Sequence, residues 1–284
     1  MSHTINDAIH HATAILGQTG HNSARLEAEL LLASVLEKDR TWLRTWPDNI
    51  LSPDQRQAFE TQICRRQNGE PIAYILGQRN FWTLTLTVTT DTLIPRHETE
   101  LLVEQALARI PRQASWTILD LGTGSGAIAL ATAKERPRCT LIATDRSLAA
   151  LHIAQQNART NEVSNIHFLA SHWLMGFARD FQAHMILSNP PYIKAQDPHL
   201  SAGDLRFEPP SALAAGHEGL DDLRHILITA KAHLKPGGWL LLEHGYQQQA
   251  MLANLLAEHG YQSVRCHRDD ANQPRLSLGQ RKTD

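Results

Sequence analysis

The second half of the chain alternates between short apolar runs and longer stretches with helical spacing, and this alternation limits the possible folds more than any other feature. The apolar runs are residues 117–121, 141–145, 184–189 and 239–243. Helical patterns lie between them, for example at 147–159 and 220–233, and two further β-rich segments, 263–267 and 275–278, come last. Strands that alternate with helices predict an α/β fold with a doubly wound, mostly parallel sheet, and the last two segments predict an antiparallel pair.

The first part of the chain has a different, helical pattern. Residues 23–32 place apolar side chains at helical spacing between strong helix formers. Residues 47–49 (Pro-Asp-Asn) break this pattern, and a new helix is predicted after them, with Ser52 as its N-cap and Pro53 at its first helical position. We therefore predict a small helical bundle that extends to about Arg66.

A β-rich stretch separates the helical part from the α/β part. Residues 73–77 are apolar, and residues 81–88 alternate between apolar side chains and threonines, which is typical of a half-buried strand. Residues 77–80 (Gly-Gln-Arg-Asn) between them predict a turn. The two segments together predict a short hairpin that links two domains.

Charge and cysteine content exclude several classes of protein. Lys and Arg number 27 against 29 Asp and Glu, a net charge of -2, whereas binding duplex DNA over a whole surface requires an excess of positive charge. Cys64, Cys139 and Cys266 are too far apart in sequence to indicate a disulfide framework or a zinc site. The chain starts without a basic-then-apolar leader and has no apolar run of about 20 residues. These features predict a cytoplasmic protein with reduced thiols, no membrane span and no metal.

A glycine-rich segment follows the first predicted strand. Residues 120–126 read Asp-Leu-Gly-Thr-Gly-Ser-Gly and lead into a helix. Glycines at alternate positions let the backbone turn sharply and approach a ligand where a Cβ atom would clash. Asp145 ends the next predicted strand, nineteen positions after Gly126 (145 − 126). A carboxylate at this place accepts hydrogen bonds from both hydroxyls of a ribose.

Three interpretations of this segment stay open: a tight turn of any α/β protein, an NAD site, and an S-adenosylmethionine site. The last is favoured because the segment lacks the GxGxxG spacing of dinucleotide sites. Asp120, which precedes the first glycine, also suits the ammonium group of a methionine, or a contact through water, better than a pyrophosphate. In addition, the segment lies in the middle of the chain, with a motif of different chemistry downstream.

That downstream motif is Asn189-Pro190-Pro191-Tyr192, which follows the third apolar run. Ligands of open α/β sheets bind in the crevice beyond the carboxyl ends of the strands, so the motif is placed where a site is expected. The prolines fix the backbone and donate no hydrogen bonds, which leaves the carbonyl of Pro190 able to accept one from a ligand. The Asn189 side-chain oxygen is a second acceptor, and Tyr192 offers a flat face for stacking.

Two acceptors side by side bind an NH₂ group, which carries two donors in one plane. An amide nitrogen is a poor nucleophile because its lone pair is delocalised into the carbonyl. Accepting a hydrogen bond from each N–H raises the electron density on nitrogen and orients it for in-line attack on a methyl donor. The motif therefore predicts methylation of a planar amide or amine nitrogen, while a structural, proline-rich turn capped by Asn is the alternative.

The chain resembles the PrmC/HemK family of protein-(glutamine-N5) methyltransferases, which act on class I peptide-chain release factors. The resemblance covers nearly the whole chain and rests on several segments besides the motif at 189–192. These are residues 69–77 (GEPIAYILG), 93–100 (LIPRHETE), 120–126 (DLGTGSG), 206–209 (RFEP), 216–220 (GHEGL) and 236–238 (PGG). Asn-Pro-Pro-Tyr alone is specific only for nitrogen methyltransferases, whereas its combination with 93–100 and a helical N-terminal region is far more specific.

The resemblance implies a role for each site residue. S-adenosyl-L-methionine, which leaves as S-adenosyl-L-homocysteine, would be bound by the residues of the glycine-rich segment together with an acidic residue, an aromatic one and an asparagine. These are Gly122, Thr123, Gly124, Ser125, Gly126, Asp145, Trp173 and Asn189. The glutamine of a release factor's Gly-Gly-Gln loop would be bound by Asn189, Pro190, Pro191 and Tyr192, of which Asn189, Pro190 and Tyr192 would be catalytic.

The resemblance also implies the architecture: a Rossmann-like class I methyltransferase domain with a mostly parallel seven-stranded sheet. We predict a helical substrate-recognition domain at 1–67, a β-hairpin linker at 68–92 and the methyltransferase domain at 93–284. One departure from the family is His97, which stands where a second proline is usual. The resemblance places Arg96, Glu98, Thr99 and Glu100 on a segment near the pocket. Alternatively, Arg96 and Glu98 pair with each other at a helix start, and Trp173 is either a cofactor contact or ordinary core.

Other functions remain possible from sequence. A nucleic-acid methyltransferase would stack a flipped base on the same motif, and a ribosomal RNA enzyme is its nearest form. A nucleic-acid methyltransferase is expected to have an added recognition region and a basic groove. The slightly negative net charge of the chain argues against such a groove. A non-catalytic binding module of the same fold predicts damage to the glycine-rich segment or to residues 189–192, and both are intact. A methyltransferase that acts on a glutamine of another protein, such as a ribosomal protein, is difficult to distinguish by sequence from one that acts on release factors.

Overall fold

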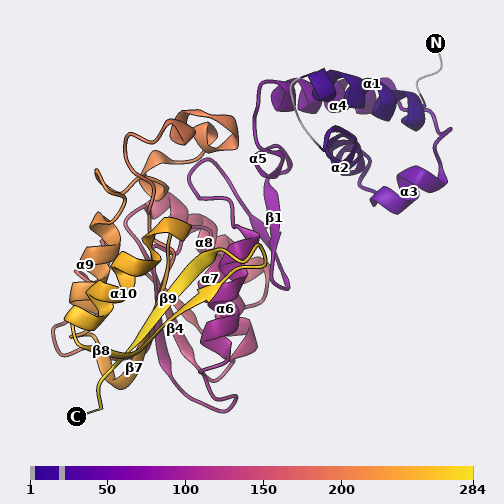
Figure 1. Ribbon diagram of the computed structural model, residues 1–284. Coiled ribbons are helices and arrows are strands. Elements are labelled where there is room, and N and C mark those ends of the chain that lie inside the picture. Colours follow the sequence, from indigo (N-terminus) through magenta and orange to yellow (C-terminus); the bar gives the residue numbers. More distant parts are fainter. Residues whose placement is uncertain (1–3, 19–22, 284) are drawn as a thin grey trace. The chain divides into compact units, whose positions relative to one another are not determined.

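The computed structural model describes residues 4–18 and 23–283 of the 284 in the chain. The chain divides into two compact units, residues 1–77 and 78–284 (Figure 1). Within the described residues no helix is long and apolar enough to cross a membrane.

The first unit is a bundle of helices, as the sequence predicts. Its helices are α1 (Ile5–Gln18), α2 (Ala24–Leu36), α3 (Arg40–Thr45), α4 (Pro53–Gln67) and α5 (Ile72–Leu76). Ser52 caps α4 with Pro53 at the first helical position, which confirms that prediction, and Gln55 completes a capping box because its side chain accepts from the Ser52 backbone. The apolar faces of the helices meet in a core that includes Leu16, Leu31 and Phe59.

The prediction of a strand at residues 73–77 is wrong, because this run forms helix α5. Pro71 is the N-cap of the helix, and Gly77 ends it in the left-handed conformation with a φ of 69°. Between them Ala73, Tyr74 and Ile75 are buried. An apolar run of five residues does not reveal its period, so the flanking Pro and Gly were the informative signals.

The hairpin exists, but it lies later in the chain than predicted. Strand β1 (Gln78–Phe81) pairs antiparallel with β2 (Leu84–Thr87), and residues 78–80, predicted as a turn, belong to β1. Both strands belong to the second unit. The alternation of threonines and apolar residues in β2 matches its burial, since Leu84 and Leu86 are buried.

The second unit is built on a seven-stranded, mostly parallel sheet, which confirms the predicted α/β class. Its strands are β3 (Thr117–Leu121), β4 (Thr140–Asp145), β5 (Ile166–Ala170), β6 (Ala183–Ser188), β7 (Leu234–Glu243), β8 (Tyr261–Arg268) and β9 (Pro274–Arg281). The order is β5-β4-β3-β6-β7-β9-β8, with β9 antiparallel to both β7 and β8. The predicted final antiparallel pair is therefore confirmed, whereas strand β5 was not predicted.

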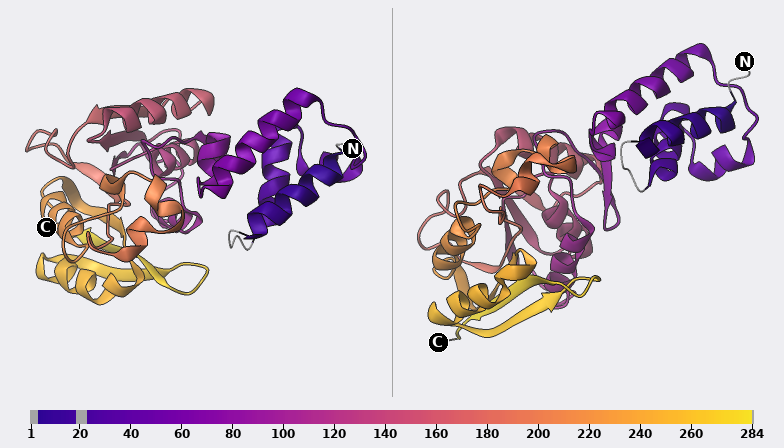
Figure 2. Two further views of the ribbon diagram at one scale, coloured as in Figure 1. Left: turned by 90° about the horizontal axis from the view of Figure 1, so that it is seen from above. Right: turned by 45° about the horizontal axis from the view of Figure 1, so that its top comes forward.

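Helices cover both faces of this sheet. They are α6 (Glu100–Leu107), α7 (Ala127–Glu135), α8 (Leu148–Thr160), α9 (Asp221–Ala230) and α10 (Gln249–Glu258), with short 3₁₀ turns η1 (His97–Thr99), η2 (Pro198–Ser201), η3 (Gly203–Phe207), η4 (Pro210–Ala212) and η5 (Tyr246–Gln248). Helices α6, α7 and α8 lie on one face, and α9 and α10 on the other (Figures 1 and 2). Each face encloses its own apolar core.

The strand order reverses direction next to β3. From β3 the chain moves to β4 and β5 on one side, and it then returns to β6 on the other side. A sheet of this type opens a crevice at the carboxyl ends of the strands where the order reverses. The segments that leave β3, β4, β6 and β7 all start at this edge, and they carry the predicted site residues.

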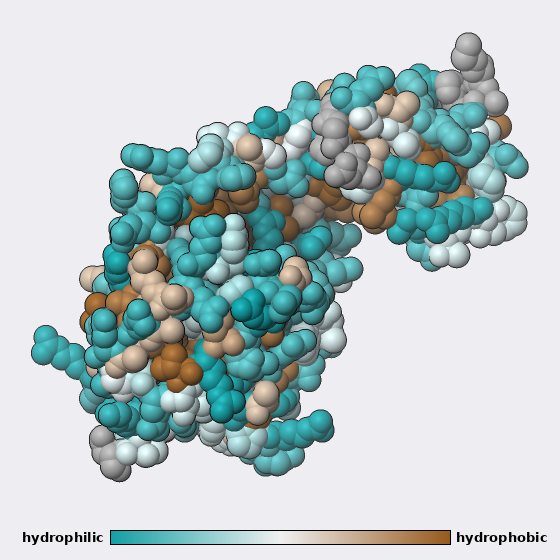
Figure 3. Space-filling view, viewed as in Figure 1, coloured by the Kyte–Doolittle hydropathy of each residue, from teal (hydrophilic) through white to brown (hydrophobic). Residues whose placement is uncertain are grey.

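The surface of the protein is mostly polar on the face shown in Figure 3, with small apolar areas between hydrophilic ones. Single exposed apolar side chains include Trp46 and Ile50 in the first unit and Met175 in the second. Scattered exposed apolar residues are normal for folded proteins and indicate no site by themselves.

Candidate active site

The glycine-rich segment forms a loop between β3 and α7. Gly122, Gly124 and Gly126 have φ angles of 72°, 55° and 89°, in the left-handed region that favours glycine. A Cβ atom on Gly122 would lie 3.1 Å from the indole ring of Trp173. Glycine at this position therefore lets the backbone and the Trp173 ring approach each other closely.

Asp145, at the end of β4, is fixed by this loop. Its Oδ2 accepts a hydrogen bond from the Gly124 backbone N–H at 3.0 Å, and its Oδ1 accepts one from Ser147 N–H at 2.9 Å. Each carboxylate oxygen can accept more than one hydrogen bond. The carboxylate is thus held in one orientation and keeps lone pairs for a ligand.

Asp120, the last-but-one residue of β3, is a fully buried carboxyl group. Its Oδ2 accepts a hydrogen bond from the Thr123 hydroxyl at 2.6 Å. Burial raises the pKa of Asp120 to about 7, while the Thr123 hydrogen bond opposes this rise. Its Oδ1 has no hydrogen-bond partner among residues 4–18 and 23–283. The Asp120 carboxyl group is fully enclosed by protein, and it fixes the start of the loop through Thr123.

A cavity of about 280 Å³ lies over the loop and the end of β4. Six of the predicted site residues line it: Gly122, Gly124, Asp145, Trp173, Asn189 and Pro191. Thr123, Ser125 and Gly126 do not line it, because they form the inner side of the loop. The Thr123 side chain bonds Asp120, and the Ser125 carbonyl accepts from the Asn157 side chain at 2.9 Å.

Trp173 forms one end of this cavity. Its side chain is only 8% exposed, and its Nε1 donates a hydrogen bond to Oδ1 of Asp222 at 3.2 Å. Trp173 was expected to be either a core residue or a cofactor contact. Its ring packs in a core and also lines the cavity, so the two alternatives do not exclude each other. A flat apolar ring beside a carboxylate is the surface that a purine with an exocyclic amine would contact.

Asn189 follows β6, where it stands next to the end of β3. Ser188 Oγ donates to the Leu121 carbonyl at 2.7 Å and ties the two strand ends together. The Asn189 Nδ2 donates to the Thr99 hydroxyl at 3.2 Å. With its NH₂ group engaged by Thr99, Asn189 is left with its side-chain oxygen as an acceptor.

Tyr192 is fixed through its backbone and through its hydroxyl group. The Gln248 side chain donates to the Tyr192 carbonyl at 3.0 Å, and the phenol donates to Oε1 of Glu243 at 3.3 Å. A Cβ atom on Gly219 would lie 2.4 Å from the same carbonyl, so only glycine permits this approach. Tyr192 is thus contacted by three different segments of the chain, and the Glu243 contact holds the phenol.

A second, smaller cavity of about 80 Å³ adjoins the first. Its lining includes Pro190, Tyr192, Leu205 and Arg96, and it shares Asn189 with the larger cavity. No hydrogen bond to the Pro190 carbonyl occurs within the described part of the chain. The size of the smaller cavity suits a side-chain amide, and Asn189 stands where the two cavities meet.

Arg96 does not pair with Glu98, so the proposed pairing of these two residues is wrong. Arg96 forms an ion pair with Glu208, whose other oxygen accepts from the Ile94 backbone at 3.0 Å. The Glu208 side chain is fully buried. It lies 112 positions from Arg96, a separation over which sequence patterns give no signal of contact.

The sequence analysis also missed residues that support the site. Asp222 and Gln248 bond directly to predicted site residues, and Glu243 bonds Tyr192. Thr99, on the segment expected near the pocket, bonds Asn189. For Glu243 and Asp222 the only available signal was their position near the ends of predicted elements, since Glu243 ends β7 and Asp222 is the second residue of α9. Across the described residues, no three His, Cys, Asp or Glu side chains are grouped to hold a metal ion.

Comparisons with known proteins agree with this geometry. Residues 7–77 match the family model described as the PrmC N-terminal domain, and residues 97–264 match the methyltransferase small domain. The chain is 51% identical over 259 residues to the release factor glutamine methyltransferase of Pseudomonas aeruginosa, covering 91% of this chain and 93% of the relative. It is 46% identical to the enzyme of that name from Vibrio cholerae, over 100% of this chain and 99% of the relative.

A solved structure shows the same fold. The methyltransferase of Pyrococcus furiosus superposes with a TM-score of 0.54 and 18% identity, over 78% of this chain and 99% of that one. At this identity the likeness concerns the fold alone. The family models and the two long bacterial alignments carry the assignment: the chain belongs to the release factor glutamine methyltransferase family.

Proposed function

We propose that this protein transfers a methyl group from S-adenosyl-L-methionine to the side-chain amide nitrogen (N5) of the glutamine in the Gly-Gly-Gln motif of class I peptide-chain release factors. The reaction would support translation termination. The observation that carries the proposal is the position of Asn189, which borders both a ligand-sized cavity and an amide-sized one. The names of the relatives supply the class of substrate.

The larger cavity fits S-adenosylmethionine by its chemistry. Asp145 offers oxygens to the ribose hydroxyls, Trp173 offers a flat face to the adenine, and Gly122 and Gly124 let the backbone approach the ligand. Asp120 lines neither cavity, and its carboxyl group supports the site by holding Thr123 of the loop. When bound, S-adenosylmethionine supplies a methyl group activated by its positive sulfonium.

The residues around the smaller cavity bind and orient the substrate amide. Its NH₂ group donates one hydrogen bond to Asn189 Oδ1 and the other to the Pro190 carbonyl. Tyr192 stacks against the plane of the amide, and the apolar Leu205 helps to exclude water. This arrangement directs the nitrogen toward the larger cavity, and such positioning removes a large part of the barrier to a reaction between two bound groups. No strong base is required if the proton leaves after methyl transfer.

The direct test is transfer of labelled methyl from S-adenosylmethionine to a purified class I release factor. The matched control is the same factor with its Gly-Gly-Gln glutamine replaced, and duplex DNA and ribosomal RNA are parallel acceptors. We expect label on the intact factor alone, with no stable complex on either nucleic acid. Label on nucleic acid and none on the factor would support methyltransferase activity but contradict the proposed substrate.

We also propose that the helical unit serves substrate recognition. It was predicted at residues 1–67, and the compact unit extends to Gly77. Residues 68–92 are proposed as the linker and 93–284 as the methyltransferase domain. The separate family match of residues 7–77 supports this division. A chain that starts at Gln78 should show a KM for the release factor raised at least about tenfold, which corresponds to about 1.4 kcal/mol of lost binding free energy. Its affinity for S-adenosylmethionine, measured by calorimetry, should stay nearly unchanged. Loss of cofactor binding in a folded truncated protein would contradict the division.

The proposed substrate also supports a cytoplasmic location, because release factors act on cytoplasmic ribosomes. The three cysteines of the chain are free thiols, as is usual in that compartment. Fractionation of cells that carry a tagged chain would test the location, and recovery outside the cytoplasmic fraction would contradict it.

A further inference from the structure

A buried carboxyl group lies behind the amide-binding motif. Glu243 is the last residue of β7, and β7 lies beside β6, which leads into Asn189. The Glu243 side chain is buried, with the residue 1% exposed, and it lines neither cavity of the active site. A buried carboxyl group is costly unless its surroundings use its charge or its hydrogen bonds.

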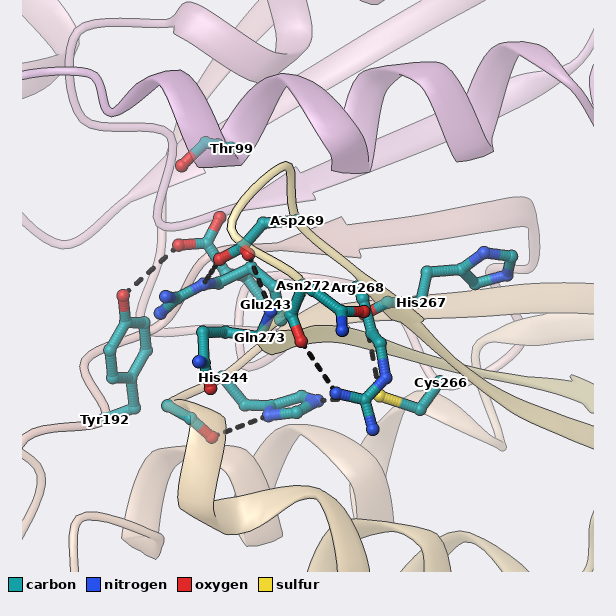
Figure 4. Close-up of polar contacts among 12 residues, drawn as sticks. Thr99, Tyr192, Glu243, His244, Cys266, His267, Arg268, Asp269, Asn272 and Gln273 are labelled. Carbon is teal, nitrogen blue, oxygen red and sulfur yellow. Dashed lines mark hydrogen bonds and ion pairs between the residues drawn. The ribbon is translucent and has the colours of Figure 1, made fainter.

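The contacts of Glu243 lead to two substrate-binding residues. Its Oε1 accepts a hydrogen bond from the Tyr192 phenol at 3.3 Å, as Figure 4 shows. Its Oε2 has no partner at hydrogen-bond length among the described residues, and the Thr99 hydroxyl is the donor that favours its ionised form. The same hydroxyl accepts from Nδ2 of Asn189 at 3.2 Å.

The contact between Asn189 and Thr99 sets one orientation of the Asn189 amide, and a Thr99 hydroxyl directed at Glu243 would favour the same one. A hydroxyl has one proton to donate. If Thr99 directs that proton at the Glu243 carboxylate, its oxygen is left to accept, so the NH₂ end of Asn189 must face Thr99. The Oδ1 end then faces the substrate as an acceptor. A reversed Asn189 would present a donor to the substrate NH₂ group, and the two would repel each other.

The charges around Glu243 come from several elements. Arg275 on β9 attracts the carboxylate, and Glu98 on η1 repels it. Arg275 is also paired with Asp269 at 3.1 Å, so its charge is shared. Burial raises the pKa of Glu243 to about 7, against the lowering effects of Thr99, Arg275 and Tyr192.

We propose that Glu243 is a positioning residue for the substrate amide: it holds the Tyr192 phenol directly and the Asn189 amide through the Thr99 hydroxyl. This inference rests on the function proposed above, because it assigns the acceptor geometry of the same site. Only the ionised carboxylate accepts on both oxygens, so the arrangement is complete above the pKa of Glu243. A protonated or amide side chain accepts on one oxygen only.

Glu243→Gln tests this role with almost no change in volume. We expect kcat for the release factor to fall about 10-fold to 100-fold, as is usual for misplaced reacting groups, while the dissociation constant for S-adenosylmethionine stays unchanged. The kcat of the unaltered protein should rise with pH through about 7, and the variant should lose this step and remain at the low-pH rate. Asp120, whose pKa is also raised to about 7, titrates in both proteins, so the difference between the profiles isolates Glu243.

Thr99 supplies a matched pair of variants. Thr99→Val keeps the shape and removes the hydroxyl, and it should lower kcat about as much as Glu243→Gln. Thr99→Ser keeps the hydroxyl and should restore most of the rate. Thermal melting and calorimetry with S-adenosylmethionine show that each variant is folded and binds the cofactor.

The outcomes separate this inference from the function on which it rests. If the unaltered protein labels the release factor and Glu243→Gln does so with the same kcat and pH profile, Glu243 has no positioning role. Equal loss of rate in Thr99→Val and Thr99→Ser would also overturn the route through the hydroxyl. If the unaltered protein fails to label the factor, both the proposed function and this inference fall.

Discussion

Replacing Asn189 by alanine is expected to lower kcat for the release factor by about 100-fold to 1,000-fold, the usual effect of removing one preorganised hydrogen-bonding group. Of the described residues that line both cavities, Asn189 alone carries a side-chain acceptor, its Oδ1. The side chain is partly exposed and bonds only Thr99 among the described residues. The free energy of unfolding should therefore change by less than about 1 kcal/mol. Single-turnover transfer of labelled methyl and chemical denaturation measure the two effects.

Asn165→Ala is the matched control for this experiment. The Asn165 side chain donates to the carbonyls of Ala133, Arg136 and Cys139, outside both cavities. Its loss removes a hydrogen bond from each of these carbonyls, so the free energy of unfolding should fall by about 1–3 kcal/mol while the folded variant methylates normally. An Asn189→Ala protein that melts early and keeps a normal rate when folded would contradict the role assigned to Asn189.

Asp145→Ala should raise the dissociation constant for S-adenosylmethionine by about 100-fold. The carboxylate is held by Gly124 and Ser147, and the cavity-facing lone pairs would accept from two ribose hydroxyls. A hydrogen bond to a charged group contributes about 1.5–3 kcal/mol, and part of the loss is recovered by water. About 100-fold corresponds to about 2.7 kcal/mol. Calorimetric titration with S-adenosylmethionine and with S-adenosylhomocysteine measures the constant without any acceptor.

The control for this variant is Asp180→Ala, which removes an exposed carboxylate outside the cavity and should leave the dissociation constant unchanged. Asp145→Asn keeps the shape and the contact with one backbone N–H, so an intermediate affinity is expected. An Asp145→Ala protein that binds the cofactor as tightly as the unaltered chain would show that the ribose lies elsewhere.

The class of fold could be predicted from the sequence, because the hydrophobic periodicity agreed with the residues that start and end helices and strands. The apolar runs that became β3, β4, β6 and β7 are buried on both faces, as strands inside a parallel sheet must be. The local signals were also correct at α4, where Ser52 and Pro53 have direct physical roles in helix initiation. The loop after β3 and the motif after β6 could be placed at one edge because the carboxyl ends of parallel strands meet there.

Prediction failed where the signal was short or where a contact spanned a long stretch of chain. Strand β5 (Ile166–Ala170) has an exposed His167 and is only partly buried, so it lacks a continuous apolar run. Helix α5 was too short to reveal its period. The pairing of Arg96 with Glu208 and the contact of Tyr192 with Glu243 depend on how distant segments meet, which no local pattern encodes.

The position of Asn189 at the junction of the two cavities limits how the acceptor range could be altered by engineering. Under the proposed function a change at Asn189 would reach both ligands at once, so selectivity for the acceptor could not be tuned there without loss of the donor. Leu205 and Leu213 border the smaller cavity alone. Libraries aimed at new acceptors should therefore vary these two leucines. A change in their volume alters which acceptor fits the smaller cavity and does not change the donor site.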